Sequence, residues 1–305
     1  MDRADLPLVH HMRKSLIRGL LATGVLTGLF GCKGAINNMD IGQMVQGGGT
    51  ALRAANMSEK DEDSLGQSIA IKATNTYGLY GDDSLTRYVE LVGEVVATAS
   101  PRPDLMYRYA ILKSDTEINA FSGPHGYILI THGLLLQIHN EAELAGVLAH
   151  ETTHICNHDG LEAAKKAGEF AGLTQVASGA ARTQAYANAA GSTISEVMES
   201  GYDKDQEFAA DAGAVKIMAA AKYDPHQYLN FLIRLQTLSA AKGGGIMSTH
   251  PGLPDRIKKV QDAIKKLGPA AKGEVLQDRW VQYTHIGTVS SSIDSDDLAA
   301  DAVMP

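Results

Sequence analysis

The stretch "VLAHETTHICNHDG", Val147–Gly160, carries histidines at positions 150 and 154 and a glutamate directly after the first of them. If this stretch is helical, His150 and His154 lie one turn apart, about 40° around the axis, so that both imidazoles can reach one ion. Glu151 then lies on the adjoining face, where its carboxylate can accept a proton from a metal-held water without ligating the metal. The pattern indicates a zinc-binding catalytic helix, and the alternative is an ordinary helix that carries histidines.

The five-residue pattern does not decide between these alternatives by itself. Ordinary composition produces it by chance in about one to two of a hundred chains of this length. A catalytic zinc also needs a third protein ligand and one open position. His158 is a poor third ligand because a continuing helix would place it about 12 Å along the axis from His150. The longer pattern H-E-x-x-H-x-x-G-x-x-H is absent, since Asn157 and Gly160 occupy its last two fixed positions.

A better third ligand lies in "DQEFAAD", Asp205–Asp211, where Glu207 and Asp211 are again four residues apart. On a helix the two carboxylates share a face. We expect Glu207 to bind the zinc and Asp211 to orient a ligating histidine through its other ring nitrogen. The alternative is a solvated acidic face, which the small, apolar residues around this pair disfavour.

Composition suits a globular protein and disfavours one class of partner. The 305 residues are 44% hydrophobic and 20% charged, which is typical of a chain with a sizeable core. A formal net charge of -8 provides no basic surface for nucleic acid, so we expect no nucleic-acid partner.

The N-terminal stretch "MRKSLIRGLLATGVLTGLFGC", Met12–Cys32, has a basic beginning followed by an apolar run, Leu20–Phe30. The run is shorter than the ~20 residues of a membrane-spanning helix and is typical of an export signal. "LFGC" resembles a bacterial lipobox, in which the cysteine is lipidated. We therefore expect residues 1–31 to form a lipoprotein-type signal peptide and the glycine-rich residues 32–57 to form a flexible tether. The alternative is a secretory signal cleaved elsewhere.

A lipid on Cys32 would hold the chain at a membrane surface rather than across the membrane. Lys33 stands where some lipoproteins retained at the inner membrane carry aspartate. We therefore expect a lipid-anchored protein on the periplasmic side of the cell envelope, at the outer membrane rather than the inner one.

Residues 58–268 have the patterning of a folded domain. Two short, β-branched and aromatic stretches, residues 105–113 and 126–131, are separated by the turn residues "SGPHG" and predict strands. The remaining patterned stretches are helical and begin near Ser58, Asp82, Asn140, Asp203, Pro225 and Pro254. The sequence thus predicts a mainly helical α+β fold. Residues 269–305 form a C-terminal extension whose acidic end we expect to be disordered.

Four motifs resemble those of the M48 peptidases, a family of membrane-linked zinc metallopeptidases. They are "NAFSGPHGYILITHGLL", "NEAELAGVLAHETTHICNH", "DQEFAAD" and "STHPGLPDR", in family order across about residues 60 to 265. The resemblance implies a zincin-like domain with a small β-sheet whose edge strand borders the active-site cleft. It also implies one Zn²⁺ per chain, held by His150, His154 and Glu207, with Glu151 as the general base.

The same resemblance gives roles to two residues of "STHPGLPDR". His250 would be a hydrogen-bond donor to the transition state or a displaceable fourth zinc ligand. Arg256 would stabilise developing negative charge or orient a carboxylate. Without the resemblance, His250 and Pro251 would be interpreted as a turn before the last helix.

The resemblance further implies that the strand Gly126–Thr131 lies along the cleft as an edge strand. An extended substrate would pair with it through main-chain hydrogen bonds. Family members often have glycine at the position of His125. The predicted substrate-binding residues are Asn119, Ala120 and Phe121, which would fix the strand, and Gly126, Tyr127 and Ile128 within it.

These observations predict a zinc-dependent endopeptidase that cleaves unfolded or misassembled envelope proteins. One alternative is a chaperone-like or latent lipoprotein whose zinc site is blocked by His250, and another is a structural lipoprotein with degenerate motifs. Only residues 270–305 follow Pro269, too few for a helical-repeat array, so we expect no repeat extension of the kind that some family members carry.

Overall fold

The computed structural model describes residues 58–166, 202–242, 250 and 252–286, all of which belong to one compact unit, Gly42–Pro305. The predicted signal peptide, Cys32 and the tether lie outside the described residues. So does the end of the C-terminal extension from residue 287 onwards. Among the described helices, none is long and apolar enough to cross a membrane.

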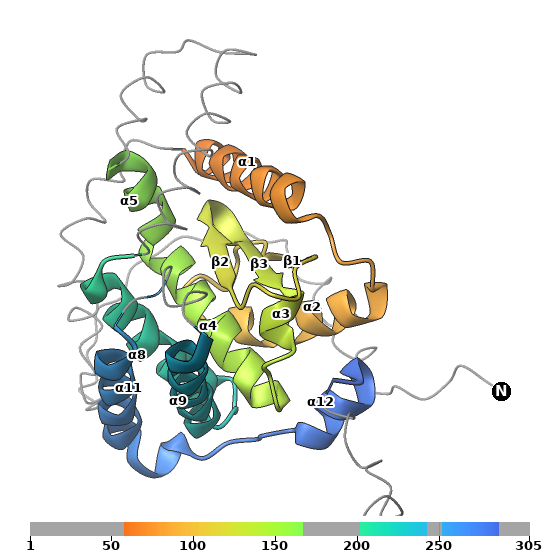
Figure 1. Ribbon diagram of the computed structural model, residues 1–305. Helices are drawn as coiled ribbons and strands as arrows, with labels where there is room; N and C mark the ends of the chain where they lie inside the picture. Colours follow the sequence, from red (N-terminus) through yellow and green to blue (C-terminus); the bar gives the residue numbers. More distant parts are fainter. Residues whose placement is uncertain (1–57, 167–201, 243–249, 251, 287–305) are drawn as a thin grey trace, which may run out of the picture. The chain divides into compact units, whose positions relative to one another are not determined.

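The described part of the chain is mainly helical with one three-stranded mixed sheet, which confirms the predicted fold class (Figure 1). In chain order the elements are α1 (Glu59–Tyr77), α2 (Asp83–Thr98), β1 (Arg108–Leu112), β2 (Ala120–Gly123), η2 (Pro124–Gly126), β3 (Tyr127–Thr131), α3 (His132–Leu135), α4 (Glu141–Asn157), α5 (Asp159–Lys166), α8 (Lys204–Ala220), α9 (Pro225–Lys242), α11 (Leu253–Leu267), η3 (Gly268–Ala271) and α12 (Gln277–Thr284).

The sheet has the strand order β1-β3-β2, with β1 parallel and β2 antiparallel to β3. Successive side chains of a strand point to opposite faces. Ile128 and Ile130 accordingly join the main core, whereas Leu129 packs with Phe121 and with Ala73 of α1. The sheet therefore lies between α1 and the core that surrounds α4.

The prediction that Gly126–Thr131 forms an edge strand is wrong, because β3 is the central strand and pairs on both sides. The edge strand beside α4 is β2, whose pairing runs from Ala120 opposite Ile130 to Gly123 opposite Tyr127. The sequence conceals β2 because its residues "AFSG" merge into a glycine- and proline-containing turn. That short segment becomes a strand only through its pairing with β3.

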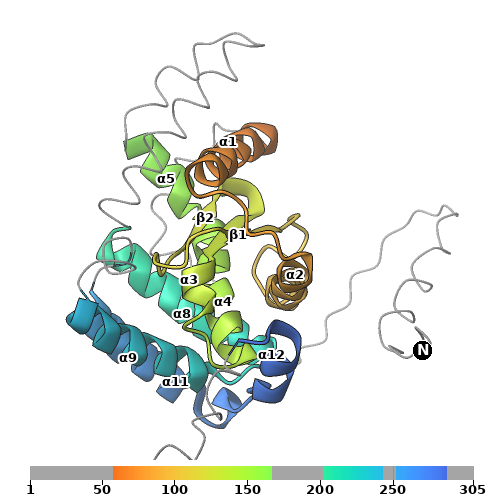
Figure 2. The ribbon, with the colours of Figure 1, turned by 45° about the vertical axis from the view of Figure 1, so that its right-hand side comes forward.

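Helix α4 is the centre of the fold and runs between the sheet and helices α8 and α9 (Figures 1 and 2). Its residues from Glu141 to Ile155 are all buried. Asn140 begins the helix by accepting a hydrogen bond from the Glu143 backbone N–H, which satisfies one of the unpaired donors of the first turn. A helix buried on every side holds its side chains in fixed positions.

Two glycines let the neighbouring helices approach α4 closely. A Cβ on Gly213 of α8 would lie 2.3 Å from Thr153 Cγ2, and one on Gly146 of α4 would lie 2.7 Å from Tyr228 Cβ. Both separations are far below van der Waals contact, so neither position has room for a side chain. Close packing of α8 on α4 brings the carboxylates of α8 against the histidines of α4.

Candidate metal centre

Helix α4 aligns its two histidines on one face, as the four-residue spacing predicts. The Nε2 atoms of His150 and His154 lie 3.1 Å apart, and both rings are buried. Glu151, between them in sequence, is also buried, and its Oε2 has no hydrogen-bond partner in the described part of the chain. The helix thus presents two imidazole nitrogens with a carboxylate beside them.

Helix α8 supplies Glu207, which is fully buried. A capping box formed by Asp203 and Gln206 fixes the start of this helix. Glu207 Oε2 lies 3.6 Å from His150 Nε2, and Oε1 lies 3.5 Å from His154 Nε2. The predicted third ligand therefore lies against both histidines.

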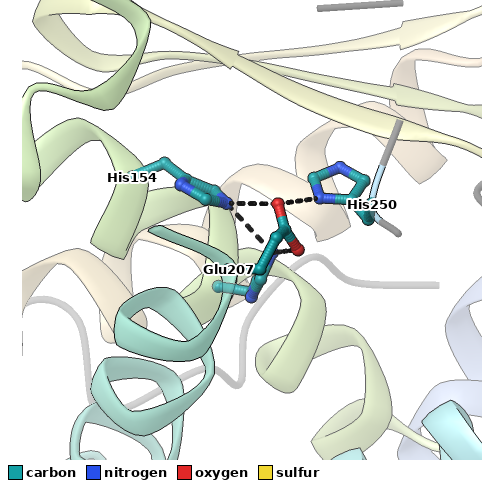
Figure 3. A group of neighbouring side chains, drawn as sticks. His154, Glu207 and His250 are labelled. Atoms are coloured by element: carbon teal, nitrogen blue, oxygen red, sulfur yellow. Dashed lines mark hydrogen bonds and ion pairs between the residues drawn. The ribbon is translucent and has the colours of Figure 1, made fainter. Parts of the chain in front are cut away.

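His250, just before α11, completes the cluster. Its Nδ1 lies 2.8 Å from Glu207 Oε1, and its Nε2 lies 3.4 Å from the Ala120 carbonyl oxygen and 3.8 Å from Glu151 Oε1. Figure 3 shows the carboxylate of Glu207 between the rings of His154 and His250. His150, His154, Glu207 and His250 each offer one ligand atom, and these four atoms lie within 4.8 Å of one another.

The chemistry of this donor set fits a metal ion. Imidazole nitrogens and a carboxylate oxygen are the ligands that zinc and similar divalent ions take in catalytic sites. Burial lowers the pKa of His154, but the carboxylates of Asp159 and Glu207 outweigh it and raise that pKa to about 10. The negative charge that attracts a proton to this ring also attracts a cation. Three of the four residues were identified from sequence spacing, and His250 came from the family resemblance.

Asp211 lies behind His150, with its Oδ1 3.1 Å from His150 Nδ1. Arg256 holds this carboxylate through two hydrogen bonds, Nε to Oδ2 at 2.9 Å and Nη2 to Oδ1 at 2.8 Å. Burial raises the pKa of Asp211, but the Arg256 charge and its hydrogen bonds outweigh burial and keep that pKa below its usual range. Asp211 is therefore an ionised acceptor in contact with the ring of a candidate ligand.

Tyr228 of α9 is a partner that the sequence interpretation missed. Burial and the Asp211 charge raise the pKa of Tyr228, so the hydroxyl stays protonated. It donates to Asp211 Oδ1 at 2.7 Å and lies 3.1 Å from His150 Nδ1. No local pattern marks it, because it lies on the apolar face of a helix far along the chain.

Asp159 was also missed. Its Oδ2 lies 2.7 Å from His154 Nδ1. The ring of Tyr202 stacks on the ring of His154, with centroids 4.3 Å apart. His158, which the helical rise excludes as a ligand, ends α4 and turns its Nδ1 towards Glu62 at 3.4 Å.

The predicted substrate-binding residues separate into two groups. Ala120 of β2 lies at the cluster, whereas Phe121 packs on the α1 side of the sheet and the Asn119 backbone N–H donates to Thr131 Oγ1. Gly126, Tyr127 and Ile128 lie at the end of η2 and in the central strand β3. A mostly apolar pocket adjoins Glu151 and His250, and its apolar lining is Ala120, Val147, Phe231, Leu232, Leu235 and Leu253.

Residues 83–264 match the family model described as peptidase family M48. The beta-barrel assembly-enhancing protease of Yersinia pestis is 24% identical over 269 residues, which are 85% of this chain and 54% of that protein. The beta-barrel assembly-enhancing protease of Escherichia coli (strain K12) is 24% identical over 63% of this chain and 41% of its own length. The mitochondrial metalloendopeptidase OMA1 of Schizosaccharomyces pombe is 26% identical over 60% of this chain and 56% of its own length. The chain spans about half the length of these curated relatives.

Proposed function

The chain belongs to peptidase family M48, and on that premise we propose that it is a zinc-dependent endopeptidase of the bacterial cell envelope. Its substrates are unfolded or misassembled envelope proteins. The main support is the buried cluster of His150, His154 and Glu207, with the unpartnered Oε2 of Glu151 beside it. A structural metal site has no use for such a carboxylate, whereas a hydrolase needs a general base.

His150, His154 and Glu207 would hold the zinc. When bound, the ion would act as a Lewis acid on the scissile carbonyl and lower the pKa of a water. Glu151 accepts the proton of the attacking water through Oε2 and later delivers it to the leaving amine. The family's general base and the unpartnered oxygen thus coincide in one side chain.

His250 and Arg256 differ in what their surroundings allow. The Nε2 of His250 lies 3.4 Å from Ala120 O and 3.8 Å from Glu151 Oε1. An N–H at this position lies beside the proposed general base, where it can donate to the oxygen on which negative charge develops. Arg256 is engaged with Asp211 and lies 2.9 Å from Glu207 Oε2 through Nη1. Its surroundings favour the orientation of carboxylates, the second of its two expected roles, over direct contact with substrate.

Substrate recognition follows from β2 and the adjoining pocket. An extended peptide can add to the edge of β2 at Ala120 through main-chain hydrogen bonds, which require no particular sequence. The small apolar pocket beside Glu151 favours contact with an apolar group of that peptide over a polar one. Unfolded proteins expose both extended backbone and apolar side chains, and folded proteins hide them.

The envelope location has support from the sequence and from the relatives. The export signal and the lipobox-like "LFGC" predict a lipid anchor at Cys32 on the periplasmic side, at the outer membrane. Two of the relatives are named for the assembly of β-barrels. We therefore place the substrates among envelope proteins and expect no nucleic-acid partner.

A second candidate function is a latent protease or chaperone-like lipoprotein. The specific observation in its favour is His250, which offers a fourth ligand atom within the cluster. A fourth protein ligand would occupy the position that the attacking water needs.

Cleavage of casein by the purified, zinc-loaded chain distinguishes these functions, with Glu151→Gln carrying the same amount of zinc as the control. Cleavage by the wild type alone is the expected result. Equal cleavage by both proteins would remove Glu151 from the mechanism. If neither protein cleaves although zinc is bound, the latent form is favoured, and His250→Ala should then release activity.

A further inference from the structure

Asp159 reaches His154 through a break in the helix. Helix α4 ends at Asn157, and His158 adopts a left-handed conformation with φ 60° and ψ 29°. Had the helix continued, a residue five positions after His154 would lie about 140° around the axis and about 7.5 Å further along it. The left-handed residue instead turns the chain back, so that the Asp159 carboxylate meets the ring of His154 at the end of the same helix.

The contact is short and buried. Asp159 Oδ2 lies 2.7 Å from His154 Nδ1, and both side chains are shielded from solvent. The carboxylate accepts a hydrogen bond from Nδ1–H, which keeps the proton of the neutral ring on Nδ1. The lone pair of the ring is therefore on Nε2. That nitrogen is the one that faces His150 and Glu207.

The same carboxylate is tied to the helix that carries the third ligand. Gln206 donates from Nε2 to Asp159 Oδ1 at 3.3 Å, and Gln206 directly precedes Glu207 in α8. The amide of Gln206 also lies 3.4 Å from Glu162 Oε2, so two carboxylates share one donor. Asp159 also contacts the ring of His154.

We infer that Asp159 is a positioning residue of the metal centre. It fixes the tautomer and orientation of the His154 ring, links that ring through Gln206 to the helix of Glu207, and thereby raises the affinity for the metal ion. His150 has an equivalent partner in Asp211, so each histidine has its own carboxylate. The inference rests on the metal-binding part of the proposed function and not on its peptidase part. A carboxylate behind a ligating histidine typically contributes 10- to 100-fold to metal affinity or activity.

Zinc affinity of the full chain, measured by competition with a chromophoric chelator, tests this role. Asp159→Asn keeps the size of the side chain and removes its charge. Glu162→Gln is the matched control, because it changes the other carboxylate at the Gln206 amide. We expect a 10- to 100-fold loss of zinc affinity in Asp159→Asn and an unchanged affinity in Glu162→Gln.

A purely structural role would give a different result. With cobalt in place of zinc, the visible spectrum reports the ligand field, and we expect it to change in Asp159→Asn but not in Glu162→Gln. Thermal unfolding of the metal-free proteins shows whether each variant is folded. Folded Asp159→Asn with wild-type zinc affinity and an unchanged cobalt spectrum would overturn the inference. Failure of casein cleavage with zinc bound would instead count against the peptidase, so the two failures remain distinct.

A second pair of variants tests the turn and does not alter Asp159 itself. His158→Gly retains the left-handed conformation at little cost, whereas the β-branched side chain in His158→Val opposes it. Both remove the same imidazole and its contact with Glu62, so they differ mainly in backbone preference. We expect lower zinc affinity in His158→Val than in His158→Gly, and equal affinities would refute the role of the turn.

Discussion

Gly213 controls how closely α8 approaches α4, and Gly213→Ala tests whether that approach supports the metal centre. A Cβ at this position would lie 2.3 Å from Thr153 Cγ2 and 2.6 Å from Thr153 Oγ1. Carbon atoms in contact are about 3.5 Å apart, so the helices must separate by about 1 Å. Glu207 and Asp211 lie on the helix that would move, and the histidines they contact lie on the other.

Two effects of Gly213→Ala oppose each other in stability. Alanine in the middle of a helix is favoured over glycine by about 1 kcal/mol. Overpacking of a buried contact costs about 1–3 kcal/mol. Because the clash here involves a β-branched side chain inside a helix buried on every side, the cost exceeds the gain. We expect a net destabilisation of up to about 2 kcal/mol and weaker zinc binding.

The assay is urea unfolding of the metal-free chain, followed by zinc competition on the same samples. Thr153→Ala is the matched partner, since it removes both of the nearest atoms, and Thr153 Cβ remains at 3.0 Å. Combined with Gly213→Ala, it should restore at least half of the lost stability, and neighbouring residues commonly couple by about 0.5–3 kcal/mol. A Gly213→Ala protein that is more stable than the wild type and binds zinc equally well would refute this reasoning.

Three further perturbations should each change the free energy of unfolding in a definite direction. Burial raises the pKa of Glu62, but His158 and Arg102 outweigh burial and lower that pKa to about 2. The ionised carboxylate therefore stabilises the folded chain. This contribution is fully present above about pH 4.5 and is lost as the pH falls towards 2. Urea unfolding from pH 6 to pH 2 should show the difference between wild type and Glu62→Gln shrinking over that window, and a constant difference would contradict it. His125→Gly should stabilise the chain by about 0.5–1 kcal/mol. His125 has φ 62°, and a left-handed backbone costs a residue with a Cβ about 1–2 kcal/mol, which exceeds the additional backbone entropy that glycine loses on folding. Lower stability of His125→Gly in urea would contradict this prediction. Zinc at 100 times its Kd should raise the free energy of unfolding by about 2.7 kcal/mol over the chelated protein, and equal melting temperatures with and without zinc would argue against a site formed by folding.

The sequence predicted the parts of the site that depend on local helix geometry. His150 and His154 share a face because they are four residues apart in one helix, and Glu207 and Asp211 share a face for the same reason. These relations hold in any well-formed helix, whatever surrounds it. That the two pairs face each other depends on the packing of α8 on α4, which spacing within one helix does not determine. The need for a third ligand and the apolar residues around Glu207 indicate it from the sequence, and the family resemblance supports it.

The features that the sequence did not predict all depend on distant partners or on a single backbone conformation. Whether β2 or β3 is the edge strand depends on long-range pairing, which four residues such as "AFSG" do not encode. Asp159 reaches His154 because His158 has a left-handed backbone conformation. A histidine in the sequence does not predict that conformation, whereas a glycine often does. Tyr228 reaches Asp211 from a helix that crosses α4 far from the motif in sequence. Sequence patterns thus identified three of the residues that come together in the candidate metal cluster, and identified less well the residues that contact them.

The charges around the centre explain why these supporting residues matter. Among the described residues, Glu151, Asp159, Glu207 and Asp211 are all buried close to the two histidines of α4, and Arg256 is the buried guanidinium that pairs with two of them. Buried carboxylates without compensating charge are strongly unfavourable. A divalent cation in the cluster would reduce the remaining three negative charges to one. The Oε2 of Glu151 has no hydrogen-bond partner in the described part of the chain, which suits the group proposed to accept a proton. The carboxylates that contact the histidines thus also add the negative charge that favours binding of a cation.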